Sequence, residues 1–65
     1  MKLQIKDAGA WRNVASFTDE QEPAVLPAAA TLLQALGPKI ALRVVDGEVT
    51  RASCTAPDYT WKRAT

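Results

Sequence analysis

The chain has 65 residues, a formal net charge of +1 and a hydrophobic content of 48%, which is typical of one small globular domain. Histidine is absent and cysteine occurs once, so the usual general base, the commonest metal ligand and an intramolecular disulfide are all excluded. The chain contains no apolar run of about eighteen residues, and its alternating start does not resemble a signal peptide. We therefore expect a cytoplasmic protein without membrane contact.

Residues 2–17 predict a β-hairpin, because polar and apolar residues alternate at its start and aromatic and β-branched residues follow. A three-residue loop at 7–9 places glycine at the left-handed third position and Trp11 opposite Ile5 on the buried face. A two-residue loop at 8–9 turns the large aromatic residues outward. Since a slip of one residue reverses every side chain, we predict the three-residue loop.

Residues 24–36 predict the main helix. Apolar residues recur there at helical spacing, and Gly37 followed by Pro38 ends the pattern. The segment 18–23 that precedes the helix is acidic, and its carboxylates suit the positive end of a helix.

Residues 39–45 and 48–54 predict a second hairpin, because the dipeptide Asp-Gly between them is a strong turn signal. A two-residue turn at 46–47 pairs Leu42 with Arg51 and places this arginine on the inner face of the sheet. An edge strand tolerates such a residue when its side chain extends to solvent.

These elements predict an α+β fold of the order ββαββ. The four strands form an antiparallel sheet in the order 2-1-3-4, and the one helix covers one face of it. We assign residues 1–54 to this domain and residues 55–65 to a tail that packs on it. Tyr59 and Trp61 point the same way in an extended segment, and we expect Trp61 to complete the small core rather than form a binding arm.

Basic residues gather on the open face of the predicted sheet. In the expected arrangement five of the eight basic residues point away from the helix, namely Lys2, Lys6, Arg12, Lys39 and Arg43. Such a face suits a phosphate backbone, but the aromatic residues that stack bases on RNA-binding sheets are absent from it. A solvated strand face is the alternative interpretation, since alternation produces one by default.

Two further groups are candidates for partner binding. Asp19, Glu20 and Glu22 form an acidic turn that could pair with arginines of a partner, or could simply favour the helix start. Tyr59 and Trp61 are the aromatic candidates in the tail. Cys54 lacks a neighbouring histidine and is expected to be a buried thiol. The sequence predicts no catalytic constellation, no metal site and no cofactor.

The pattern "W..VASF.D", the alanine- and leucine-rich helix and "LRVVDGEV" together resemble small bacterial and phage proteins of ββαββ type. The resemblance covers residues 3–49 and implies packing roles only, at Trp11, Val14, Phe17, Leu33 and Val44. In size and in its lack of chemical motifs, the chain is similar in kind to phage-encoded inhibitors such as anti-CRISPR proteins.

Three functions remain open. The first is a non-enzymatic protein-binding module, for example a phage-encoded inhibitor of a host defence complex. Its surface would include Lys6, Arg12, Arg43, the acidic turn and the tail. The second is a small nucleic-acid-binding module that uses the basic open face. The third is a phage structural or assembly subunit. A homodimer could also form through an edge strand.

Overall fold

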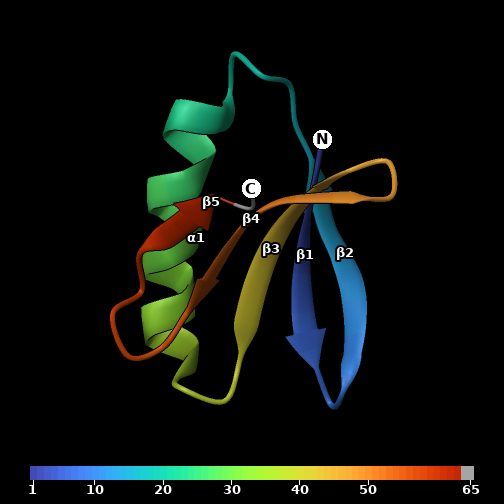
Figure 1. The fold of residues 1–65 in the computed structure, drawn as a ribbon. Coiled ribbons are helices and arrows are strands. Elements are labelled where there is room, and N and C mark those ends of the chain that lie inside the picture. The colour runs from blue at the N-terminus through green and yellow to red at the C-terminus, as the bar shows by residue number, and fades with distance from the viewer. Residues whose placement is uncertain (64–65) are drawn as a thin grey trace.

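The computed structural model describes residues 1–63. The elements follow in the order β1 (Lys2–Asp7), β2 (Ala10–Ser16), α1 (Glu22–Leu36), β3 (Ala41–Asp46), β4 (Val49–Thr55) and β5 (Trp61–Arg63). The strands form one sheet in the order β2-β1-β3-β4-β5, and every neighbouring pair is antiparallel. Figure 1 shows α1 along one face of this sheet, with β5 close beside the helix.

The α+β class, the single helix and the antiparallel sheet are confirmed. The expected count of four strands is wrong, because β5 extends the order 2-1-3-4 at the edge of β4. Among residues 1–63, no helix has both the length and the apolar character that crossing a bilayer requires.

The helix begins at Glu22, two residues before the expected start. Pro23 lies in the first turn, where a missing N–H group costs nothing. Pro27 lies inside the helix, and the helix continues past it to Leu36. Gly37 ends the helix with φ of 101°, and its N–H donates to the Leu33 carbonyl oxygen at 3.1 Å.

The first hairpin closes with a two-residue turn, so the expected three-residue loop is wrong. Ala8 and Gly9 both have positive φ, 53° and 82°, and Asp7 pairs with Ala10. Trp11 therefore pairs with Lys6 instead of Ile5, and its side chain lies on the face away from the helix.

A bulge in β2 allows the hairpin to combine this two-residue turn with a buried Phe17. The register shifts between Leu3, which pairs with Ala15, and Gln4, which pairs with Asn13, so that Val14 is the extra residue. The bulge reverses the alternation of side chains along β2. Trp11 consequently points away from the helix, whereas Phe17, beyond the end of β2, is buried in the core.

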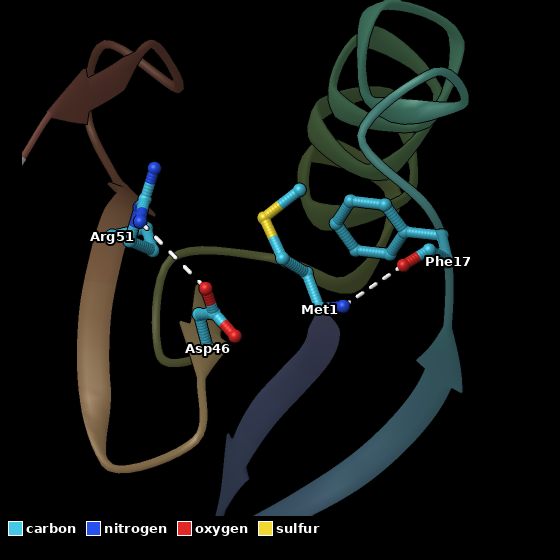
Figure 2. A network of polar contacts seen from close by, with 4 residues as sticks. All are labelled: Met1, Phe17, Asp46 and Arg51. Atoms are coloured by element: carbon cyan, nitrogen blue, oxygen red, sulfur yellow. Dashed lines mark hydrogen bonds and ion pairs between the residues drawn. The ribbon is translucent and has the colours of Figure 1, made fainter.

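The second hairpin also differs from its expected register. Asp46 pairs with Val49 across a turn at 47–48, and a shift between Val44 and Val45 follows. Arg51 is the bulged residue of β4 and has no partner on β3, so its predicted pairing with Leu42 is wrong. Its side chain is exposed and lies 3.7 Å from the Asp46 carboxylate (Figure 2).

The core lies between the helix and the sheet. Leu33 of α1 and Leu42 of β3 are fully buried, and the remaining members of the cluster are Leu3, Phe17, Ala29, Val44 and Cys54. The backbones of Met1 and Phe17 exchange two hydrogen bonds of 2.9 Å at the helix end of the first hairpin (Figure 2). This pair holds the phenyl ring of Phe17 at the margin of the core.

The last strand ties the helix to the sheet. Trp61 pairs with Cys54 of β4, is half-buried against the core, and donates its indole N–H to the Leu26 carbonyl oxygen at 2.7 Å. Arg63 forms an ion pair with Glu22 at the helix start. These contacts add apolar cover to a core that one helix covers from a single side.

Replacing Trp61 should separate its packing from its hydrogen bond. We expect Trp61→Ala to lower the free energy of unfolding by about 3 kcal/mol, because it removes a large side chain from the core margin. Trp61→Phe should cost about 1 kcal/mol, the worth of the indole hydrogen bond. Urea denaturation followed by circular dichroism measures both. Lys62→Ala, on the same strand but exposed, is the control and should change stability by less than about 0.5 kcal/mol; equal losses for all three variants would contradict this role.

The turn of the first hairpin can be tested by substitution at Ala8. An alanine with positive φ is strained, and asparagine tolerates this conformation better. Ala8→Asn should therefore stabilise the protein by about 0.5 to 1 kcal/mol, and Ala8→Val should destabilise it by about 1 kcal/mol or more. Thermal unfolding measures the difference. A destabilising Ala8→Asn would indicate the three-residue loop instead.

Candidate functional site

The face of the sheet that the helix leaves uncovered is polar and is here called the open face. Leu42 and Val44 point from β3 into the core, so Arg43 between them points the opposite way. Paired residues of neighbouring strands share a face, and the row that includes Arg43 crosses all five strands. From β2 to β5 this row consists of Asn13, Gln4, Arg43, Ser53 and Lys62.

Three residues of this row and Trp11, which pairs with Lys6 in the next row of the same face, form a connected set of side chains. We call this set the Arg43 cluster: Gln4, Trp11, Asn13 and Arg43. The Arg43 Nε atom donates a hydrogen bond of 2.8 Å to Gln4 Oε1. Gln4 Nε2 in turn donates to Asn13 Oδ1, also at 2.8 Å. The Arg43 guanidinium lies over the Trp11 ring, 4.1 Å from its centroid, in cation–π contact.

The cluster fixes Arg43 in one orientation before any partner arrives. The hydrogen bond engages only the Nε atom, and stacking on the indole ring fixes the guanidinium plane. The two Nη groups remain available as donors with the geometry that matches a carboxylate or a phosphate. Little rotamer entropy then remains to be lost on binding.

The charge of Arg43 has no acidic counterpart within residues 1–63. The ion pairs in that range are Arg51 with Asp46, Lys62 with Asp58, and Arg63 with Glu22. Lys62 hydrogen-bonds the Asp58 carboxyl and so lowers the pKa of Asp58, which keeps a negative charge beside that end of the row. Lys2 and Lys6 are exposed on the open face on either side of Gln4, and no ion pair within residues 1–63 uses them.

Two of the basic residues predicted on the open face, Arg12 and Lys39, lie elsewhere in the structure. Lys6 and Arg43 lie on the open face as expected, but Arg12 pairs with Ile5 and lies on the helix side of β2. Its predicted place on the open face is wrong because the two-residue turn reversed the hairpin register. Lys39 lies in the turn after α1, outside the strands.

Sequence reasoning missed Trp11, Gln4 and Asn13 as members of the site. The expectation that the basic face lacks an aromatic residue is wrong, since Trp11 lies there beside Arg43. The dipeptide Ala8-Gly9 was the available signal. A two-residue turn at these positions places Trp11 and Lys6 on the same face.

The acidic candidates lie at the start of α1, at the end of the molecule away from the turn of the first hairpin (Figure 1). Asp19 and Glu20 are exposed before the helix, and Glu22 is paired with Arg63. An open groove of about 680 Å³ lies here, lined by Asp19, Glu22, Val49, Thr50, Arg51 and Arg63. Its two carboxylates and two guanidinium groups oppose each other, so the groove favours no ligand of a single charge.

The aromatic residues of the tail are half-buried. Tyr59 packs against the core with φ of 53°, and its N–H donates to the Thr55 carbonyl oxygen at 3.0 Å. Trp61 faces the helix. Both side chains therefore have a structural role, whatever else they contact.

Cys54 is 1% exposed and lies in the core cluster. Burial raises the pKa of its thiol, and the nearby Asp58 carboxylate adds to this effect. Within residues 1–63, no group of three or more acidic or cysteine side chains is arranged to hold a metal ion.

The raised pKa of Cys54 predicts slow thiol chemistry in the folded protein. The folded state retains the proton longer than the unfolded state, so this contribution to stability is present below the unfolded pKa and is lost as pH rises through the folded pKa. At about pH 8 we expect a disulfide reagent to label Cys54 only as fast as the protein opens, and faster as urea is added. Labelling of the folded protein at the rate of a free thiol would contradict this.

Comparison with known protein families, with curated proteins and with solved structures finds no significant match to this chain. The site therefore has to be interpreted from its own geometry.

Proposed function

We propose that this chain is a non-enzymatic protein-binding module whose contact surface is the open face of the sheet. The observation that supports this most is the Arg43 cluster, in which an uncompensated guanidinium is held on the Trp11 ring by Gln4. Tryptophan and arginine are the residue types that most often dominate binding energy at protein interfaces. A side chain held ready on an uncovered face, and not needed for the core, favours recognition as its role.

The charges of this face indicate the chemistry of the partner. Lys2, Lys6 and Arg43 lie on the open face, and none of the three takes part in an ion pair within residues 1–63. A carboxylate of the partner could accept two hydrogen bonds from the Arg43 Nη groups. We therefore propose an acidic surface of another protein as the target.

A module of this kind acts by occupying the surface of its partner. Inhibition of that partner is the mode of action we propose, since a bound partner surface is closed to other ligands. A cytoplasmic setting belongs to the same proposal and is supported by the single free cysteine.

Affinity capture with matched variants tests this function. The immobilised protein should retain one stoichiometric partner from a cell lysate, and Arg43→Glu or Trp11→Ala should lose it. We expect at least about a hundredfold weaker binding, which corresponds to the 2 kcal/mol or more typical of dominant interface residues. Arg12 lies beside Trp11 on β2 but on the helix side of the sheet. Arg12→Glu therefore reverses a charge outside the open face and should keep the partner.

Recovery of no stoichiometric protein would count against the proposal. So would a partner that Arg43→Glu and Trp11→Ala retain but Arg12→Glu loses, since the helix side of β2 would then be the contact surface. Urea denaturation of each variant checks that altered binding does not arise from unfolding.

Nucleic-acid binding is the second candidate, and the position of Trp11 favours it. Single-stranded RNA-binding sheets present aromatic rings among basic side chains, as this face does with Trp11, Lys2, Lys6 and Arg43. Against it, Arg43 already covers one side of the indole ring, and the whole chain has a net charge of only +1. Fluorescence anisotropy with labelled single-stranded RNA separates the two candidates. Tight binding that weakens steeply with salt would favour nucleic acid over protein.

A further inference from the structure

The exposed side of the helix is uncharged, and Thr31 and Gln34 are its polar residues. No charged residue occurs between Pro23 and Leu36. Leu32 and Leu36 are 44% and 49% exposed, although large apolar side chains are usually placed inward on a helix of this kind. A surface helix normally has charged residues on its solvent side, and a helix that is apolar all round is normally covered.

Four of the exposed helix residues lie in one row along the helix, which we call the outer ridge: Ala24, Ala28, Leu32 and Leu36. They are spaced four residues apart, so they follow the i±4 row that packs between the rows of a neighbouring helix in the commonest class of helix contact. None of the four belongs to the core cluster or to the residues packed against it.

We propose that the outer ridge is a self-association surface, and that the outer ridge of a second copy covers it in antiparallel orientation around a two-fold axis. The order of side-chain sizes along the ridge is the first argument. Two small residues precede two large ones, so a two-fold axis at position 30 places Ala24 against Leu36 of the other copy and Ala28 against Leu32. A small residue then faces a large one at every contact, as interdigitating side chains require.

Charge complementarity is the second argument. The same axis brings the acidic turn before one helix next to the segment after the other helix. Asp19 and Glu20 are exposed in that turn, and Lys39 is exposed after the helix. No ion pair within residues 1–63 uses any of the three. Antiparallel packing thus joins opposite charges and opposite helix ends, whereas parallel packing would join acid to acid.

The size of the surface indicates a weak dimer. A helix of 15 residues is about 22 Å long, and two such helices bury less than the roughly 1,200 Å² typical of stable interfaces. We expect reversible association that dilution undoes. The helix and the open face lie on opposite sides of the sheet, so the dimer would present two copies of the Arg43 cluster to a partner.

Sedimentation equilibrium of the full chain between about 10 μM and about 1 mM tests the proposal. The wild-type protein should change from monomer toward dimer across this range. Leu32→Lys should remain monomeric, because it places a charge in an apolar contact on both copies. Gln34→Lys adds the same charge on a different exposed side of the helix, and Arg43→Glu changes only the open face; both should dimerise like the wild type.

A size exchange tests the antiparallel pairing without adding charge. Ala28→Leu alone creates a large–large contact and Leu32→Ala alone leaves a gap, so each should weaken dimerisation by about tenfold. The double variant Ala28→Leu/Leu32→Ala restores a small residue against a large one and should return within about threefold of the wild type. Circular dichroism confirms folding of each variant.

A wild-type chain that stays monomeric throughout this range would overturn the proposal, as would a dimer that Leu32→Lys leaves intact. A double variant weaker than both single variants would exclude the antiparallel pairing. Loss of dimerisation with Arg43→Glu would assign the contact to the open face instead. The outcomes at Leu32 and Ala28 leave partner capture by the Arg43 cluster untouched, because that capture is measured separately.

Discussion

Trp11 in β2 and Phe17 just after it lie on opposite faces of the sheet, and the bulge at Val14 makes this possible. Without the extra residue, a two-residue turn would keep Trp11 and Phe17 on the same face, since they are six positions apart and side chains alternate with a period of two. With the bulge, Phe17 enters the core and Trp11 lies under the Arg43 guanidinium. The core on one face and the Arg43 cluster on the other both depend on this irregularity.

The small size of the domain explains why β5 matters to the rest of the fold. One helix covers one side of the sheet, and a chain this short buries a limited share of its surface. β5 adds a fifth strand at the edge of β4, and Trp61 connects that strand to the Leu26 carbonyl of the helix. The closure occurs on the helix side, so the open face stays uncovered. The core therefore lies on the helix side of the sheet, and the proposed binding surface lies on the open face.

Hydrophobic periodicity and turn signals were enough to predict the element types, the helix and the order of the first four strands. They failed at both hairpin registers because each turn differs from the predicted one, and a bulge then shifts the pairing again farther along the strands. A bulge inserts one residue into a strand and changes the side-chain faces beyond it, and a pattern of period two contains no information on where this happens. The awkward inner position predicted for Arg51 was a visible sign, since this residue lies at a bulge. The three-residue β5 was too short to give a periodic signal.

The proposed binding surface depends on the contact between Trp11 and Arg43, because it exists only if both residues lie on the open face. Nuclear Overhauser spectroscopy of the isolated protein tests the contact directly. We predict cross-peaks from the Trp11 indole protons to the side chains of Arg43 and Gln4, with the Arg43 methylene signals shifted upfield by the ring. Cross-peaks from the Trp11 indole to Ile5 and Leu33 would instead place the ring in the core and contradict the account.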